Sequence, residues 1–508
     1  MPSQPAKAVA SVSDGWWARF RKTRQDDRGV AWRRFGQSLA EAEREVAALD
    51  AYRRAARRDP VDFPARHGMG RLLCAHRRYR EAKTVYRELL TINPHDAIAA
   101  GQLGHILVDE GHTRGYHEAE GLLRRALDLL ALDTSNQDAV LVPLCRLLAA
   151  QEREREILAL TEGRDSVPTL LQRGQTQAAL GDFDGARASL QRVISHEPAN
   201  ARAWYHLAGL KLLDGAQGAA GLAAETDLGD WLAAQAPANE GESRVFFAFA
   251  AAYALENAGR IGDAWPWYRE ANAGVREDLP SNVAHIEDFE RRTIRAYTAP
   301  VLNRLARGHV TTPGPAPVFV VGMPRSGTTL MERIIGAHPQ AAPLGERADL
   351  REIINAASHA DGSEHLPWPE RAVHLHPYTS GAIAGAYLAR VNSLARSGTL
   401  VAVDKMPEQF QLIGLIAAAM PQARIIHMTR DPRDVGLSCY TARFHDGLAW
   451  SFDLESIARR QASHDRVMAH WRNLIPPGRM LDVVYEDLVA APVPWVARVL
   501  DFLGLDWD

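Results

Sequence analysis

Cysteine is scarce in this chain, which has three cysteines among 508 residues, at positions 74, 145 and 439. Thiols this few and this widely spaced exclude a disulfide framework and are typical of a protein in a reducing compartment. Long apolar runs are also missing, since no stretch approaches the roughly 20 residues that span a bilayer. The first residues lack the apolar core of a signal peptide. We therefore expect a cytoplasmic protein with no membrane association.

An excess of charge of one sign is absent as well. The formal net charge is −3, with 59 basic and 62 acidic residues, so no broad basic surface is available for nucleic acid, and any anion must bind at a local site. The histidines show no ligand-like cluster, because His464 and His470 are six residues apart on a predicted helix and lie on different faces. We expect no nucleic-acid partner and no metal.

The strongest chemical signal is the segment 317–339, PVFVVGMPRSGTTLMERIIGAHP. Its apolar, mostly β-branched start predicts a buried strand, and the apolar spacing over 328–337 predicts a helix after a loop bounded by glycines. A strand, a loop and a helix in this order direct backbone N–H groups and the positive end of the helix dipole at one point. A phosphate binds well at such a point.

The loop almost matches the nucleotide-binding pattern GxxxxGK(S/T), but Thr328 stands where the pattern requires lysine. Because that lysine contacts the β- and γ-phosphates, its absence argues against a triphosphate ligand. Arg325, Ser326, Thr328 and Thr329 still offer hydrogen-bond donors to a single phosphate. A glycine turn without any ligand is the structural alternative.

We expect a polar leader over residues 1–36 and an array of helical repeats over residues 37–310. A period of 34 residues links Pro60 to Pro94 and Gly70 to Gly104, and further small and aromatic residues recur in phase, among them Ala82, Tyr86, Gly174, Ala186, Leu190, Ala264 and Tyr268. This is the pattern of tetratricopeptide repeats. We expect 137–166 to be a degenerate repeat, 213–242 a loop with one short helix, and 286–307 a single helix.

The breaker-rich segment 311–317 predicts a linker, and 318–508 alternates between apolar strands and helices. Expected strands are 318–321, 400–403, 424–428 and 480–484, and expected helices are 328–337, 380–396, 408–420, 434–440, 454–473 and 494–503. This alternation predicts a mostly parallel sheet covered by helices, with binding residues at the carboxyl ends of the strands. The fold class is thus an α-helical solenoid followed by a P-loop-like α/β domain.

Polar motifs follow the strands, as a site at the carboxyl ends requires. Arg430 and Ser438 are eight residues apart in HMTRDPRDVGLSCY, Lys405 follows the second strand in DKMPEQF, and Tyr485 follows the fourth. Glu346 lies 21 residues after Arg325. Arginine makes paired hydrogen bonds to phosphate, and a partly desolvated carboxylate accepts protons. Structural alternatives are a helix cap or acidic partner for Arg430 and a surface ion pair for Glu346.

The string PRSGTT from Pro324 resembles the 5′-phosphosulfate loop of sulfotransferases, which use 3′-phosphoadenosine 5′-phosphosulfate (PAPS). The resemblance is greatest to protein-tyrosine sulfotransferases and to bacterial sulfotransferases that carry tetratricopeptide repeats. It implies that the 5′-phosphosulfate is held by Arg325, Ser326, Gly327, Thr328 and Thr329. It also implies 3′-phosphate contacts from Arg430 and Ser438, and a nucleotide contact from Tyr485.

The same resemblance implies catalytic roles for Glu346 as the general base and for Lys405 and Arg325 as cations at the bridging oxygen of the leaving group. His338 is a rival base. The tyrosine-sulfotransferase pattern has another arginine four residues after the serine, but Ala442 stands there and Arg443 comes next. The chain also stops soon after its last helix, where the family continues into a segment that contacts PAPS.

We therefore expect transfer of a sulfuryl group from PAPS to a hydroxyl acceptor, without a metal. The sequence does not distinguish between a peptide tyrosine, a glycan, a lipid and a small phenol as the acceptor. The repeats would bind the acceptor, a partner protein or a second protomer, or would serve only as a structural arm. Two alternatives are a repeat scaffold with an inactive sulfotransferase-like domain and a nucleotide-dependent kinase or hydrolase.

Overall fold

The computed structural model describes residues 29–110, 113–130, 134–151, 153–360, 366–444 and 448–507. Most of the expected leader, including Trp16 and Trp17, lies outside the described residues. Helix α2 (Gly29–Glu41) already begins within that expected leader, and it buries Trp32 and Leu39. The chain forms two compact units, divided between Glu197 and Pro198.

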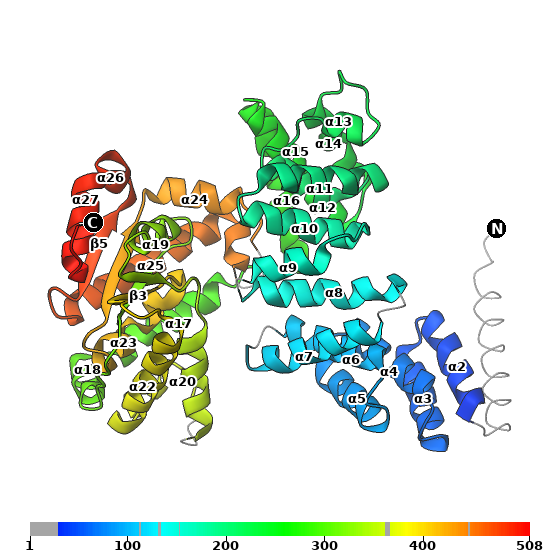
Figure 1. The fold of residues 1–508 in the computed structure, drawn as a ribbon, viewed down its shortest axis with the longest axis horizontal. Helices are drawn as coiled ribbons and strands as arrows, with labels where there is room; N and C mark the ends of the chain where they lie inside the picture. Colours follow the sequence, from blue (N-terminus) through cyan, green and yellow to red (C-terminus); the bar gives the residue numbers. More distant parts are fainter. Residues whose placement is uncertain are drawn as a thin grey trace, which may run out of the picture. The chain divides into compact units, whose positions relative to one another are not determined.

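The first unit is built from consecutive helices that pack in pairs (Figure 1). After α2 they are α3 (Glu45–Arg58), α4 (Phe63–Ala75), α5 (Tyr79–Ile92), α6 (Ala97–Asp109), α7 (Thr113–Leu129), α8 (Thr134–Ala149), α9 (Glu154–Thr161), α10 (Val167–Ala179) and α11 (Phe183–His196). A Cβ on Gly70 would lie 2.5 Å from the ring of Tyr86. Glycine is therefore what lets the aromatic ring fill the gap between α4 and α5, as the repeat pattern predicts.

The second unit begins with further helices, α12 (Ala201–Gly209), α13 (Ala216–Ala219), α14 (Leu228–Gln235), η1 (Ala236–Ala238), α15 (Gly241–Asn257), α16 (Ile261–Asp278), α17 (Val283–Ala296) and α18 (Ala299–Ala306). Two predictions were wrong here. The segment 213–242 holds two short α-helices and a 3-10 turn instead of one helix. The single helix expected over 286–307 breaks at Tyr297 and Thr298, because a new helix begins at Ala299 and Pro300, in its first turn, has no N–H to continue the old one.

A five-stranded, all-parallel sheet follows, in the order β2-β3-β1-β4-β5. Its strands are β1 (Ala316–Gly322), β2 (Ala341–Pro343), β3 (Val401–Asp404), β4 (Arg424–Thr429) and β5 (Met480–Val484). The parallel sheet and the four expected strands are confirmed. Strand β2 escaped prediction because its three residues include a proline and carry no strand pattern.

Helices cover both faces of this sheet. They are α19 (Thr328–Gly336), α20 (Asp349–Ala360), α21 (Arg371–His374), α22 (Pro377–Leu394), α23 (Ile413–Ala419), α24 (Pro432–Tyr440), α25 (Leu454–Leu474), α26 (Tyr485–Ala490) and α27 (Pro492–Leu503), with 3-10 segments η2 (Pro407–Leu412) and η3 (Ala449–Phe452). The helix expected over 408–420 thus starts as a 3-10 turn. No helix in the described part of the chain is both long and apolar enough to cross a bilayer.

The central strand β1 shows why the sheet is buried on both sides. Val318 and Val320 pack in one apolar cluster with α19 and α27, whereas Phe319 and Val321 pack in another with α22, α23 and α25. Successive side chains of a strand point to opposite faces of the sheet. An unbroken apolar run is therefore expected in a strand that helices cover on both faces. The carboxyl ends of β1, β3, β4 and β5 remain as the edge where loops can form a site.

Candidate active site

The loop after β1 turns sharply into α19. Arg325 and Gly327 both have left-handed backbone conformations, with φ of +69° and +100°. Gly327 caps α19, and Thr328 begins the helix. Ser326 and Thr328 are buried, and the Ser326 Oγ atom has no hydrogen-bond partner among the described residues. The loop therefore has the geometry expected of an anion site at a helix N-terminus.

Two glycines hold this loop close to its neighbours. A Cβ on Gly322 would lie 2.6 Å from the carbonyl oxygen of Met428 in β4, and a Cβ on Gly327 would lie 2.6 Å from the ring of Tyr485. Real side chains do not tolerate such contacts. The glycine spacing in the sequence thus reflects packing as well as backbone conformation.

The residues expected at the 3′-phosphate lie beside the loop. Arg325 donates a hydrogen bond from Nε to the Ser438 Oγ atom at 2.8 Å, and Arg430 donates from Nη1 to the carbonyl oxygen of Arg325 at 3.2 Å. The Arg430 guanidinium also lies 4.6 Å from the ring centre of Tyr485 and 3.4 Å from Asp434. The ion pair with Asp434 is the structural alternative that the sequence left open for Arg430.

Glu346 and Lys405 meet at the ends of neighbouring strands. The Lys405 Nζ atom donates a hydrogen bond to Oε1 of Glu346 at 2.5 Å. The Lys405 side chain is 8% exposed and that of Glu346 is 55% exposed. Water reaches the carboxylate, whereas the ammonium is held inside the protein. The surface ion pair that the sequence left open for Glu346 was expected with Arg347 or Arg351, but Glu346 pairs with the buried Lys405, and Arg347 pairs with Asp349.

Backbone contacts fix the segment that carries Glu346. The Gly345 N–H donates to Oε1 of Glu332 at 2.8 Å, and the Lys405 N–H donates to the Gly345 carbonyl at 3.0 Å. Gln409 donates to the Arg347 carbonyl at 3.2 Å and to Oδ2 of Asp404 at 3.1 Å. The base candidate therefore sits on a loop that is held from both sides.

Asp404 is fully buried at the end of β3, directly before Lys405. Its Oδ2 atom also accepts a hydrogen bond from the Tyr387 hydroxyl at 2.7 Å. Burial raises the pKa of Asp404 from 3.8 to about 7, against the opposing effect of its hydrogen bonds from Tyr387 and Gln409. This carboxyl group is thus poised to change its protonation state near neutral pH.

A cavity of about 690 Å³ brings most of the predicted residues together. The predicted site residues in its lining are Arg325, Gly327, Thr328, Thr329, Glu346, Arg430 and Tyr485. The other lining residues are Pro324, Leu330, Met406, Pro407, Glu408, Phe444 and Leu448. Ser326 is buried within the loop, Lys405 contacts the lining residue Glu346, and Ser438 contacts the lining residue Arg325. The predicted residues thus form one constellation at the carboxyl ends of the strands.

Two other candidates lie elsewhere. The Nε2 atom of His338 contacts the carbonyl oxygen of Asp506 at 3.0 Å, and its Nδ1 atom accepts from the Gln340 N–H, so the ring is used in packing at the helix end. Arg443 lies 4.3 Å from the ring centre of Phe246 in α15 and pairs with Glu242. In the described part of the chain, no three His, Cys, Asp or Glu side chains form a group that could hold a metal.

Several residues of the site were missed by sequence reasoning. Glu332, Asp404 and Gln409 support the base loop, and Glu408 lines the cavity. Asp404 and Gln409 lie in the quoted string DKMPEQF, where a buried acid beside the lysine could have been suspected. Glu332 has no such signal, because only the folded chain brings it to Gly345.

Two family models match parts of this chain. A family model described as the sulfotransferase family matches residues 317–508, and a tetratricopeptide-repeat model matches 169–200. The similarity to the sulfotransferase family covers the C-terminal domain, which we call the sulfotransferase domain. The sulfotransferase domain contains all the site residues described above, whereas the matched repeat is formed by α10 and α11.

Relatives are similar over part of their length. An uncharacterized protein of Aquifex aeolicus is 33% identical over 279 residues, which cover 54% of this chain and 36% of that protein. The protein-tyrosine sulfotransferase of Drosophila melanogaster is 27% identical over 196 residues, or 38% of each chain. The matches therefore span little more than a third of either relative. A solved sulfotransferase domain from the curacin biosynthetic pathway is 17% identical, with a TM-score of 0.28, over 39% of this chain and 76% of that one.

Proposed function

We propose that the sulfotransferase domain moves a sulfuryl group from PAPS to a hydroxyl acceptor. The observation that carries this proposal is the meeting of three features around one cavity: the phosphate loop without a lysine, the Glu346–Lys405 pair, and the Arg430 and Ser438 side chains next to Arg325. A kinase or hydrolase would need a group at the γ-phosphate, and Thr328 is too short to replace lysine there.

The chain's own residues fit the donor. The orphaned Ser326 hydroxyl and the N–H groups at the start of α19 suit the 5′-phosphosulfate, and the buried Arg430 Nε atom, which has no partner among the described residues, suits the 3′-phosphate. Tyr485 packs under Arg430 and fixes its plane. When bound, PAPS would supply the sulfuryl group, and its S–O bond to phosphate would break as the bond to the acceptor oxygen forms.

Glu346 would take the proton from the attacking hydroxyl, since its carboxylate lines the cavity and still has one oxygen, Oε2, outside the bond to Lys405. Arg325 and Lys405 would stabilise the negative charge that develops on the bridging oxygen as the nucleotide leaves. Two cations held by the protein can do this by electrostatics, in the way that cations serve phosphoryl transfer.

Calorimetry with the full chain tests the donor. We expect 3′,5′-adenosine bisphosphate, the product left by PAPS, to bind more tightly than ATP, because the proposed 5′- and 3′-phosphate sites would each hold one of its phosphates. A preference for ATP would contradict the proposal. Transfer from labelled PAPS to a panel of acceptors tests the reaction, and tight nucleotide binding without any transfer would favour a scaffold with an inactive domain. A cytoplasmic location and a partner or second protomer bound through the repeats stay predictions.

A further inference from the structure

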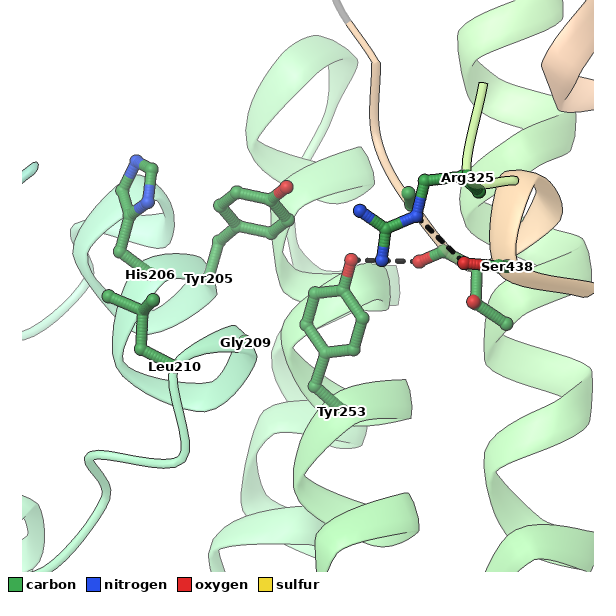
Figure 2. Close-up of a pocket in the computed structure, with 9 residues that line it drawn as sticks. Tyr205, His206, Gly209, Leu210, Tyr253, Arg325 and Ser438 are labelled. Carbon is green, nitrogen blue, oxygen red and sulfur yellow. Dashed lines mark hydrogen bonds between the residues drawn. The ribbon is translucent and has the colours of Figure 1, made fainter. Parts of the chain in front are cut away.

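Two spaces adjoin the loop arginine, and the proposed base lines the larger one. The smaller space, of about 300 Å³, has Tyr205, Tyr253, Arg325 and Ser438 in its lining. Figure 2 shows the hydrogen bond from Arg325 to Ser438 at this space. Glu346 lines the 690 Å³ cavity instead. A hydroxyl that gives its proton to Glu346 must therefore be bound in the larger cavity.

The larger cavity extends along the carboxyl edge of the sheet. Arg430 and Tyr485 line it after β4 and β5, on one side of the loop that follows β1. Glu346 follows β2 and residues 406–408 follow β3, on the other side of that loop. The strand order β2-β3-β1-β4-β5 thus divides the lining in two. One end holds the nucleotide candidates, and the other, which we call the base end, holds Glu346 and residues 406–408.

Glu408 is held beside the segment that carries Glu346. It lies in the first turn of η2, and the next residue, Gln409, donates a hydrogen bond to the Arg347 carbonyl oxygen at 3.2 Å. The two glutamates are therefore each one residue away from the same hydrogen bond. The Glu408 side chain is 30% exposed and lines the cavity. A group bound by Glu408 would lie close to a hydroxyl at Glu346.

A buried arginine lies behind Glu408, but its charge is already matched by another carboxylate. The Arg460 guanidinium is fully buried, and its Nη2 atom is 3.8 Å from Oε1 of Glu408. Its Nη1 atom donates a hydrogen bond to Glu290, which is also buried and accepts a second bond from the Ser463 hydroxyl. A buried cation needs such a hydrogen-bonded partner. With two carboxylates around one guanidinium, an excess negative charge remains at the cavity wall, on Glu408.

We propose that Glu408 binds an ammonium group of the acceptor while the acceptor hydroxyl lies at Glu346. The inference rests on the proposed sulfuryl transfer and names a second functional group of its acceptor. The ammonium could belong to a small amino alcohol or to a lysine near a hydroxyl residue of a peptide, since both present the same charge.

The surroundings of Glu408 favour a cation over other groups. Met406 and Pro407 precede it in the lining, and Leu448 lines the cavity directly before η3, whose Trp450 ring centre is 5.9 Å from the Arg460 guanidinium. Because apolar neighbours limit access of water, an ion pair here is stronger than one on the open surface. An acidic acceptor would be repelled, and a neutral hydroxyl would gain a hydrogen bond without the attraction between charges.

Binding at Glu408 also decides which atom of an amino alcohol reacts. A carboxylate stabilises the protonated form of an amine, and a protonated nitrogen has no lone pair with which to attack sulfur. The hydroxyl, whose proton Glu346 accepts, stays the nucleophile. We therefore expect the sulfuryl group on oxygen and a free amine in the product, which mass spectrometry of the product distinguishes.

Glu408→Gln tests the proposal, because it removes the charge and keeps the size of the side chain. Glu290 still balances Arg460 in this variant. The matched control is Glu455→Gln, at an exposed position in the first turn of α25. The probes are pairs that differ in charge and hardly in size: 6-amino-1-hexanol against 1-heptanol, and tyramine against 4-propylphenol. Calorimetry on the full chain, with and without saturating 3′,5′-adenosine bisphosphate, measures their binding, and kcat/KM with labelled PAPS measures their transfer.

We expect the wild type and Glu455→Gln to prefer the amine of each pair by about tenfold, and Glu408→Gln to bind both members equally. Glu408→Asp keeps the charge and should keep a preference for the amine. Nucleotide affinity should be unchanged in all three variants. A third pair, a peptide with lysine beside tyrosine and the same peptide with norleucine, separates the sources. A larger preference in this pair than in the small pairs would identify a peptide lysine, and the reverse would identify a small amino alcohol.

No preference for the amines in the wild type, or the same preference in Glu408→Gln, would overturn the proposal. Equal weakening of the amine and the neutral probe in Glu408→Gln would also overturn it, because Glu408 would then act only through Arg460. These results are distinct from a failure of the proposed function, which would appear as a lack of binding to 3′,5′-adenosine bisphosphate. The titrations without nucleotide test Glu408 in that case as well.

Discussion

The Lys405 ammonium lies 2.5 Å from Oε1 of Glu346, although the two residues are 59 positions apart in the chain. The lysine is almost fully buried, while more than half of the glutamate side chain is exposed. A buried ammonium needs a partner, so the carboxylate is held in one orientation and its second oxygen is directed elsewhere. The pair thus acts as a unit in which one member positions the other.

Glu346→Gln should lower the rate of transfer from labelled PAPS by about 10²- to 10⁴-fold, the usual contribution of a general base. The amide cannot accept the proton, but it is the same size and can still contact Lys405. Affinity for 3′,5′-adenosine bisphosphate should stay near normal. Glu455→Gln, at an exposed position in the first turn of α25, is the control. Turnover of Glu346→Gln at the parental rate would show that another group is the base.

Lys405→Met should also slow transfer strongly, and the double variant with Glu346→Gln should be little worse than the slower single variant. Residues that act as one unit show such non-additive effects, because removing either one already disables the other. Single-turnover rates of the four proteins measure the coupling. Fully additive losses would mean that the two side chains act independently despite their contact.

How far the sequence predicts this site depends on how local each signal is. The loop from Gly322 to Thr329 is contiguous, so strand, turn and helix could be placed from residue types alone. Lys405 and Arg430 follow apolar strands directly, and parallel strands bring such positions to one edge. The break at Tyr297 was missed because the apolar pattern continues across Pro300.

Contacts between distant parts of the chain could not be predicted. The Tyr253 hydroxyl and the Thr441 carbonyl are 188 positions apart, and Tyr205 is adjacent to Trp204, whose position fits the repeat pattern. Neither Tyr253 nor Tyr205 lies in a sequence motif that would connect it with the loop. Only the folded chain shows that both face Arg325.

Substitutions at the 3′-phosphate candidates should change nucleotide selectivity. We expect Ser438→Ala and Arg430→Gln each to weaken binding of 3′,5′-adenosine bisphosphate by about tenfold or more, because hydrogen bonds to a charged phosphate contribute about 1.5–3 kcal/mol. Binding of 5′-AMP, which lacks the 3′-phosphate, should change far less. Calorimetry measures the affinities for 3′,5′-adenosine bisphosphate and 5′-AMP, and their ratio gives the selectivity.

A matched control for the arginine is Arg433→Gln. Arg433 lies in the same segment, pairs with Asp431 and is 89% exposed, so its loss should leave both affinities unchanged. If Arg430→Gln weakens 5′-AMP and 3′,5′-adenosine bisphosphate by the same factor, then Arg430 supports the loop through its bond to the Arg325 carbonyl and does not read the 3′-phosphate.

Gly327→Ala should distort the loop and weaken nucleotide binding at least tenfold. Its φ of +100° is unfavourable for alanine, and the new Cβ would lie 2.6 Å from the ring of Tyr485. Adding Tyr485→Ala removes the steric part and leaves the backbone strain. Because Tyr485→Ala also removes the proposed nucleotide contact, the loss caused by Gly327→Ala is measured in both backgrounds, and a smaller loss in the Tyr485→Ala background would separate the two causes. No effect of Gly327→Ala would mean that the loop can adopt another conformation at little cost.

Asp404 should make stability depend on pH between about 4 and 7. Its pKa is about 7 in the folded chain against 3.8 for the free side chain, so in this range the folded protein keeps a proton that the unfolded chain releases. The stabilisation from the protonated carboxyl is thus complete below pH 4 and is lost as pH rises to 7. Asp404→Asn cannot titrate, so its melting temperature relative to wild type should rise across this window and level off above it.

The asparagine can still accept the bonds from Tyr387 and Gln409 through its oxygen, while its NH₂ group takes the place of Oδ1, which has no partner among the described residues. The buried NH₂ group lowers the stability of Asp404→Asn by the same amount at every pH. The titration of Asp404 is therefore reported by how the difference in melting temperature between wild type and Asp404→Asn changes with pH, and not by the size of that difference at one pH. Melting temperatures from pH 4 to 8 would be compared for wild type, Asp404→Asn and the exposed control Asp501→Asn. A pH-independent difference in melting temperature between wild type and Asp404→Asn would contradict the prediction. It would mean that Asp404 has the same pKa in the folded and unfolded chains, because charges other than its two hydrogen-bond partners offset the effect of burial.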